Sequence, residues 1–109
     1  MINLIEKIRK ARESTLTVNG HTFTIRRPTD IEMTQGGFGL EAMLDRFVVG
    51  WDVREIDIVP GGMPEPVPFS SALFSEWIAD RPEDWMEIAN AIKQAYIDHT
   101  EKRSESVKN

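Results

Sequence analysis

The side chains that could carry out chemistry in this chain are few and scattered. It has two histidines, His21 and His99, and no cysteine, which excludes thiol catalysis, disulfides and zinc–thiolate sites. No serine lies in the Gly-x-Ser-x-Gly turn that presents the nucleophile of many hydrolases. We interpret His21 as a rim residue beside a turn and His99 as a half-exposed structural residue. The residue types therefore predict a protein that is not an enzyme and that needs no cofactor.

Carboxylates and glycines form two patterns that could hold an ion. The acidic residues at 52, 55 and 57 suggest a calcium loop, but its sixth-position glycine and terminal glutamate are missing. The glycine-rich stretch 35–39 suggests a phosphate-binding loop, but no Gly-Lys-Ser/Thr follows it. Asp80 and Asp84 are better explained as the end of one helix and the start of the next. We therefore predict no metal site, and we interpret residues 35–39 as a hinge.

The apolar residues between positions 40 and 51 have the most regular spacing in the chain. They recur at steps of three and four residues, which would place them on one face of a helix of about three turns. The members of this stripe are Leu40, Met43, Leu44, Phe47, Val48 and Trp51. A stripe of this width must be covered by other elements. The pattern predicts a central helix over residues 40–51.

An N-terminal β-hairpin is predicted over residues 15–27. Asn19-Gly20 favours a two-residue type I′ turn, because both of its positions need positive φ. That turn would pair Leu16 with Phe23, and it would sort the apolar and the threonine side chains onto opposite faces. Two strands alone are marginally stable, so the apolar face must pack against helices.

Two further helices are predicted in the first third of the chain. An amphipathic helix ends near Glu13, and its charged residues are expected to face solvent rather than a membrane. A short helical turn begins at Thr29, which forms a capping box with Glu32, and it stops before Gly36.

Two more helices are predicted in the second half. Ser70 is placed as the N-cap of one, with Phe69 and Phe74 as a hydrophobic staple across it. Pro82 suits the first position of the last helix, which is expected to fray by Ser104.

Together these patterns predict an α+β fold, mainly α, with four or five short helices packed against one N-terminal β-hairpin. Residues 1–100 would form a single domain and residues 101–109 a flexible tail.

The composition, 40% hydrophobic and 28% charged, is typical of a globular protein. No apolar run approaches the roughly 18 residues of a membrane span. A net charge of −5 with dispersed basic residues argues against nucleic acid as a partner.

Some aromatic and methionine side chains are candidates for a partner surface rather than for the core. Core packing is the first interpretation for each, but methionine and aromatic residues also suit interfaces. The candidate partner-binding residues are Trp51, Met63, Phe69 and Trp77.

Three stretches of the chain together resemble a known family. The run 46–51, Arg-Phe-Val-Val-Gly-Trp, is followed by an acidic loop and then by Val-Pro-Phe-Ser at 67–70, which opens a helix. The hairpin leads into Arg-Arg-Pro-Thr-Asp at 26–30. This combination resembles the tail assembly chaperones of long-tailed bacteriophages and prophages of Gram-negative bacteria, over most of residues 1–100. The chain departs from the family in lacking a glycine soon after Trp51 and in a loop lengthened by residues 60–68.

The resemblance implies a non-enzymatic protein of the host bacterial cytoplasm. Such a chaperone binds the long, aggregation-prone tape-measure protein and holds it soluble while tail-tube subunits polymerise around it. The tail-tube protein is a second implied partner, and self-association is open. One alternative is a small structural component of the virion, such as a head–tail completion protein. Another is a small enzyme or enzyme regulator.

Overall fold

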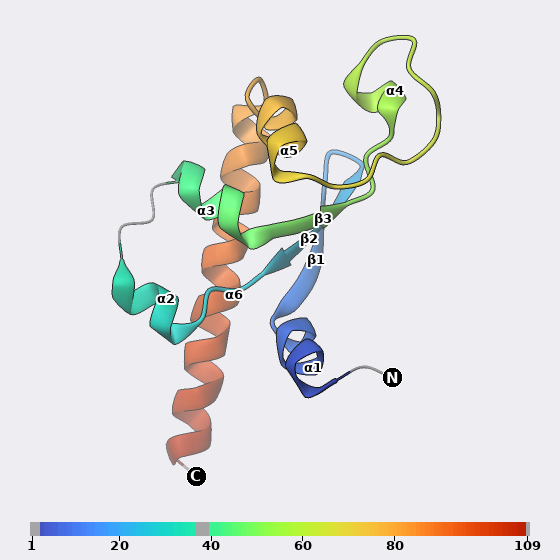
Figure 1. The fold of residues 1–109 in the computed structure, drawn as a ribbon. Coiled ribbons are helices and arrows are strands. Elements are labelled where there is room, and N and C mark those ends of the chain that lie inside the picture. The colour runs from blue at the N-terminus through green and yellow to red at the C-terminus, as the bar shows by residue number, and fades with distance from the viewer. Residues whose placement is uncertain (1–2, 37–39, 109) are drawn as a thin grey trace.

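Six helices and three strands make up the part of the chain that the structure, a computed structural model, describes (Figure 1). It describes residues 3–36 and 40–108, with the backbone alone for residues 40, 41, 43 and 105–108. The elements are α1 (Leu4–Ala11), β1 (Glu13–Val18), β2 (His21–Arg26), α2 (Asp30–Gln35), α3 (Leu40–Phe47), β3 (Val48–Trp51), α4 (Glu55–Ile58), α5 (Ser71–Ile78) and α6 (Pro82–Lys108). The predicted α+β class, mainly α, is confirmed, although α6 is long, with 27 residues.

The predicted hairpin and its register are confirmed. Strands β1 and β2 are antiparallel, and Leu16 lies opposite Phe23. Asn19 and Gly20 form the turn with φ of 49° and 84°, values that asparagine and glycine tolerate better than other residues. Because the strands pair in this register, the apolar side chains of both strands share one face, as the sequence predicts.

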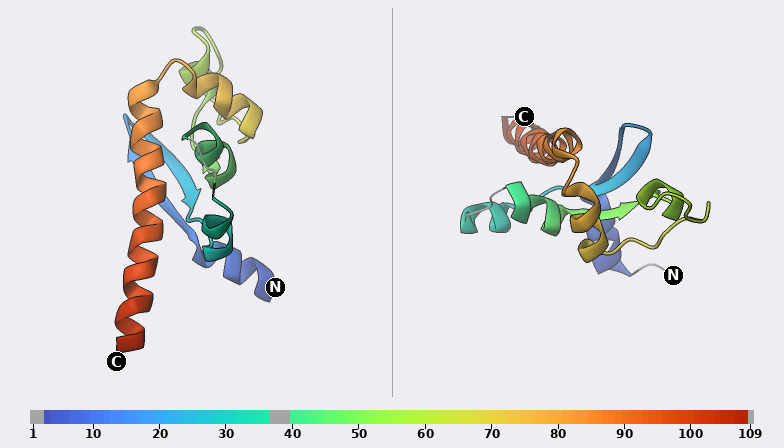
Figure 2. Two further views of the ribbon diagram at one scale, coloured as in Figure 1. Left: turned by 90° about the vertical axis from the view of Figure 1, so that its left-hand side faces the viewer. Right: turned by 90° about the horizontal axis from the view of Figure 1, so that it is seen from above.

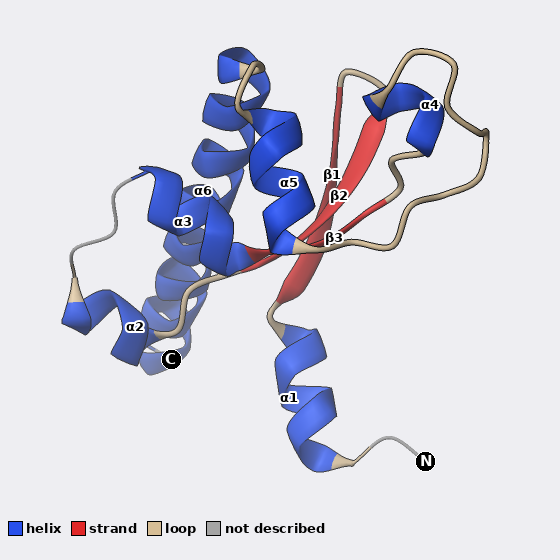
Figure 3. Ribbon diagram, turned by 45° about the horizontal axis from the view of Figure 1, so that its top comes forward, coloured by secondary structure: helices blue, strands red, loops and turns tan. Residues whose placement is uncertain are grey.

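The prediction of a central helix over residues 40–51 is wrong in its last turn. Helix α3 ends at Phe47, and residues 48–51 form β3, which pairs antiparallel with β2 and gives the strand order β1-β2-β3 (Figure 3). Val48 and Val49 are β-branched and Gly50 is a weak helix former, so this stretch favours a strand. The edge of β2 that does not pair with β1 supplies hydrogen-bond partners that a last helical turn over residues 48–51 would not use.

A β-bulge in β3 explains why the apolar residues 48 and 51 have the spacing of a helix although they lie in a strand. Val48 lies opposite Ile25 and Gly50 opposite Thr24, so Val49 is an extra residue in β3. In a regular strand, residues three apart point to opposite faces, but a bulge restores them to the same face. Residues 48 and 51 can therefore both meet the core, as they would on a helix. A Cβ at Gly50 would lie 3.3 Å from the Thr24 Cβ, so the close strand pairing at this point suits glycine.

The predicted helix starts are confirmed by their capping bonds. Thr29 Oγ1 accepts a hydrogen bond from the Glu32 amide at 3.1 Å, and Glu32 Oε1 accepts one from the Thr29 amide at 3.0 Å. The Leu73 amide donates to Ser70 Oγ at 3.1 Å. The rings of Phe69 and Phe74 lie 6.0 Å apart across that cap, as a hydrophobic staple requires. Each cap satisfies amides that have no partner within their own helix.

One hydrophobic core joins the sheet to α3, α5 and α6. Its buried residues come from every strand, from these three helices and, in the case of Val53, from the segment between β3 and α4: Val18, Phe23, Ile25, Leu44, Phe47, Val48, Val53, Phe74, Trp77, Ile88, Ala89 and Ile92. Helix α6 runs the length of the molecule beside the sheet (Figure 2). Its first turn also holds the hairpin, because buried Asp84 accepts a hydrogen bond from Asn19 Nδ2.

None of the helices among residues 3–36 and 40–108 is long and apolar enough to cross a membrane.

Helix α6 extends further than the sequence predicts. It continues to Lys108 rather than fraying by Ser104. Arg103 donates to the carboxylate of Asp30, which fixes the helix to α2 one turn before its end. This contact joins residues 73 positions apart, and local sequence patterns cannot indicate it. The hinge predicted at residues 35–39 lies mostly outside the described residues.

The capping box yields the first test. We expect Thr29→Ala to destabilise the protein by about 1 kcal/mol, because the Glu32 amide loses its acceptor. Urea denaturation measures the change. Thr34→Ala is the matched control, since the Thr34 hydroxyl donates only to the Ile31 carbonyl within the same helix. An equal loss in both variants would contradict a specific role for the cap.

Candidate partner-binding site

Three of the four predicted partner-binding residues belong to an aromatic cluster inside the fold. We define this aromatic cluster as Phe23, Trp51, Phe69, Phe74 and Trp77. Its neighbouring ring centroids are 5.5–6.4 Å apart, in edge-to-face or tilted pairs that stabilise aromatic packing beyond buried area. The cluster joins β2 and β3 to α5 and to the segment before it.

The contacts of these three residues are structural. Trp77 is only 6% exposed. Trp51 is half-buried, and its indole Nε1 donates to the Val67 carbonyl at 2.8 Å, so it fastens the returning loop to β3. Phe69 is half-buried against Trp51, with ring centroids 5.5 Å apart. The rings therefore belong to the core or its edge, and Met63 alone of the four is largely exposed, at 57%.

Met63 lies beside α4, in a segment with two further exposed apolar residues that the sequence did not predict to be exposed. Ile56 and Val59 are exposed on the same loop, and the Ile56 amide donates to the Met63 carbonyl at 2.9 Å. We call these three residues the loop patch. No pattern in the sequence marks these residues as exposed, because the aliphatic residues of 52–59 lie among charged ones. Figure 1 shows this loop projecting at the α4 end of the molecule.

Backbone hydrogen bonds hold the loop patch in a defined shape. The Glu55 amide donates to the Glu65 carbonyl at 3.2 Å, and the Val67 amide to the Val53 carbonyl at 2.9 Å. Glu55 Oε1 also accepts from the Met63 amide at 3.1 Å. The chain thus returns beside α4 as a short ladder, which presents the three apolar side chains with little further ordering to be done on binding.

Gly62 permits the tight return of this loop. A Cβ at this position would lie 2.8 Å from the Glu55 carbonyl oxygen, closer than real contacts allow. The segment that carries the residues of the loop patch is acidic, with Asp52, Glu55, Asp57 and Glu65, although Asp57 is paired with Arg54. Exposed apolar side chains in an acidic segment can accept apolar groups of a partner while the charged residues stay in water.

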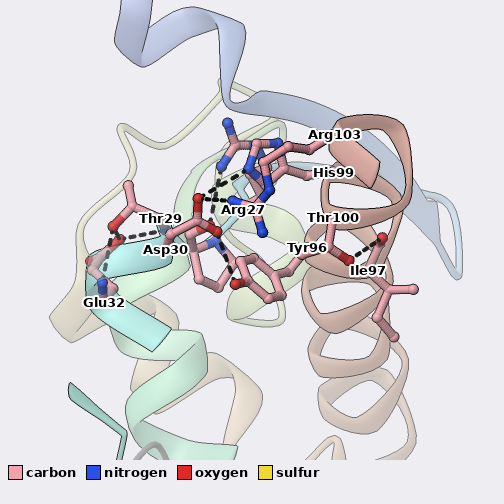
Figure 4. Close-up of polar contacts among 10 residues, drawn as sticks. Arg27, Thr29, Asp30, Glu32, Tyr96, Ile97, His99, Thr100 and Arg103 are labelled. Atoms are coloured by element: carbon pink, nitrogen blue, oxygen red, sulfur yellow. Dashed lines mark hydrogen bonds and ion pairs between the residues drawn. The ribbon is translucent and has the colours of Figure 1, made fainter. Parts of the chain in front are cut away.

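A group of titratable residues lies elsewhere, between α2 and α6 (Figure 4). We define this polar cluster as Asp30, Tyr96, His99 and Arg103. Asp30 Oδ1 accepts from the Tyr96 hydroxyl at 2.9 Å, and Oδ2 accepts from Arg103 and lies 3.6 Å from His99 Nε2. Figure 4 shows the three α6 side chains converging on the first residue of α2.

Asp30 and Tyr96 are poorly suited to proton transfer at neutral pH. The hydrogen bond from Tyr96, followed by the charge of Arg103, holds the pKa of Asp30 below its usual range. The same bond raises the pKa of Tyr96. Both shifts move away from neutrality, whereas a general acid or base works best with a pKa near the operating pH. We interpret the cluster as a fastening between α2 and α6.

A second ionic contact secures the start of α2. Arg26 donates two hydrogen bonds to the carboxylate of Glu32, at 2.9 and 3.0 Å, in the bidentate arrangement that arginine favours. The bonds from Arg26 and then the Thr29 amide lower the pKa of Glu32 to about 2, against the opposing effect of burial. Arg26 also lies over the Phe47 ring at 4.6 Å, which ties β2 to the end of α3.

The two histidines lie far apart in structural settings. His21 packs edge-on against Trp77, with ring centroids 5.6 Å apart, and His99 belongs to the polar cluster. No three His, Asp or Glu side chains among the described residues are grouped so that they could hold a metal ion.

Comparison of the chain with family models, with curated proteins and with solved structures gives no match.

The different contributions of the buried Trp77 and the exposed Met63 to the free energy of unfolding can be measured. We expect Trp77→Ala to lower the free energy of unfolding by about 3–5 kcal/mol, as removal of a buried aromatic residue does. Met63→Ala should change it by less than about 0.5 kcal/mol, since its side chain is exposed. Denaturation in urea compares the two. A large loss for Met63→Ala would contradict its place on the surface.

The ionised form of Glu32 should make stability depend on acid pH. Its pKa is about 2 in the folded protein and 4.5 ordinarily, so its contribution is complete above about pH 4.5 and is lost as pH falls toward 2. Glu32→Gln should be less stable at neutral pH and show a shallower fall over this range; Asp30, whose pKa is also lowered, keeps its share. Denaturation midpoints at several pH values measure this, with Glu87→Gln as control. An unchanged slope in Glu32→Gln would contradict the assignment.

Proposed function

We propose that this protein is a non-enzymatic tail assembly chaperone of a long-tailed phage or prophage, acting in the host bacterial cytoplasm. Its partner would be the tape-measure protein, which it keeps soluble during tail-tube polymerisation. The resemblance of residues 46–51, 67–70 and 26–30 to that family supports the proposal. The observation that carries it is the loop patch: three exposed apolar side chains on a hydrogen-bonded loop, where one of the predicted partner-binding residues lies.

The chemistry of the loop patch suits a chaperone. Methionine adapts its shape to different apolar partners, and Ile56 and Val59 add aliphatic area beside it. Three side chains bury little surface, so a single contact would be weak and reversible. Weak contacts repeated along a long substrate would let the chaperone leave as tube subunits take its place. The acidic residues of the segment 52–65 and the net charge of −5 would keep the loaded complex soluble.

Co-expression with fragments of the tape-measure protein from the same genome tests the proposal. We expect the wild-type protein to keep such fragments in the soluble fraction and to co-purify with them. The complex should survive raised salt, because apolar contacts are not screened. Met63→Ser should weaken it about tenfold, since a buried methionine is worth about 1.5–3 kcal/mol.

Met86→Ser is the matched control, because Met86 is an exposed methionine on α6 outside the loop patch. Loss of binding in both variants would reject the loop patch as the site. A complex that dissolves at moderate salt would reject apolar recognition. Persistence of the protein in purified virions would favour the alternative, a structural component of the particle.

A further inference from the structure

Helix α1 leaves its apolar side uncovered. It buries none of its residues, and Leu4, Ile5 and Ile8 are 72%, 61% and 46% exposed. Steps of three and four residues place these side chains on one side of the helix. A helix this short draws its stability chiefly from packing of such a side, so a covering partner is expected.

The charge of α1 is opposite to that of the chain as a whole. Residues 3–12 carry four basic side chains and one acidic, whereas the whole chain has a net charge of −5. The basic residues are Lys7, Arg9, Lys10 and Arg12. A surface that covers α1 should therefore combine apolar side chains with acidic ones.

A groove of this description lies between α3, α5 and the start of α6. It has a volume of about 310 Å³ and is lined by Leu44, Phe74, Ile78 and Trp85, with Asp45 in its wall. Leu44 and Phe74 are buried and form its floor, while Ile78 and Trp85 are half-exposed. Its size is at the lower end of pockets that take small apolar groups, about 300–1,000 Å³.

Acidic residues also flank the stretch of chain that closes the groove. Ala79 lines the groove, and Asp80 and Glu83 follow it in the turn and first residues of α6. Arg81 lies between them in sequence, but its guanidinium stacks over the Trp77 ring at 4.4 Å. The groove thus offers apolar walls beside carboxylates, the chemistry complementary to α1.

The helix cannot enter the groove of its own chain. β1 begins at Glu13, two residues after α1 ends, so α1 is tied to one end of the sheet. Helix α5 and the start of α6 lie near the other end (Figures 1 and 3). We infer that α1 of one copy docks into the α3–α5–α6 groove of a second copy. Because two different surfaces meet, the contact is heterologous and can produce a reciprocal dimer, a ring or a filament.

This inference does not depend on the proposed function, since the loop patch takes no part in the contact. Sedimentation velocity of the full chain over a wide concentration range tests it. Ile8→Asp places a charge on the exposed side of α1, and Ala79→Arg fills the groove and puts a cation beside Asp45. Both positions are exposed, so neither change disturbs the core. Ile97→Asp, at an exposed position of α6 that lines neither surface, is the control.

We expect the mass of the wild type and of the control to rise with concentration. Each of the other two variants should associate at least about tenfold more weakly than the wild type. An equimolar mixture of Ile8→Asp and Ala79→Arg should recover a dimer, because one variant keeps the groove and the other keeps the helix. Circular dichroism verifies that both are folded.

Three results would overturn the inference. The wild type could remain monomeric at every concentration. The mixed variants could fail to associate while the wild type does, which would indicate a different interface. Association could be lost in Ile8→Asp but kept in Ala79→Arg, which would mean that α1 packs on a second α1. Binding of the monomeric wild type to vesicles of anionic lipid, abolished by Ile8→Asp, would assign α1 to a membrane surface instead.

Discussion

The need to cover Phe23 governs the arrangement of this fold. Phe23 lies in the central strand, is fully buried, and faces Leu16 on one neighbouring strand and Trp51 on the other. Its ring centroid lies 6.1 Å from that of Phe74 and 5.6 Å from that of Trp77, both on α5. A large apolar group at this position stabilises the fold only if strands and helix close around it together. The bulge in β3 and the cap at Ser70 both serve that closure.

Local chemistry made much of the fold predictable. The hairpin register follows from Asn19-Gly20, and the starts of α2, α5 and α6 follow from Thr29, Ser70 and Pro82, because each acts within a few residues of itself. β3 could not be predicted in this way, since a bulged strand reproduces the three-residue spacing of a helix. Choosing between them requires knowledge that the edge of β2 is free, which is information about another part of the chain.

The candidate site was predictable only in part, for a related reason. Residue type alone selected Trp51, Phe69 and Trp77 beside Met63, but exposure separates them, and exposure is decided by tertiary packing. Ile56 and Val59 were missed because aliphatic residues in an acidic loop do not indicate which way they point. The contacts of Asp30 with Tyr96 and Arg103 span 66 and 73 positions, so no local pattern reveals them.

The N-terminal hairpin is covered by α6, the last helix of the chain, and this has a consequence for synthesis of the protein. The hairpin is local in sequence and can form within about 1–10 μs once it leaves the ribosome. Its apolar face, however, is covered by residues of α5 and α6, and Asn19 at its turn bonds to Asp84, 65 positions later. At about 5–20 residues per second, the hairpin waits seconds with Phe23 exposed before its cover is translated. Until α6 emerges, the exposed apolar face of the hairpin is therefore open to contacts that favour aggregation of the nascent chain.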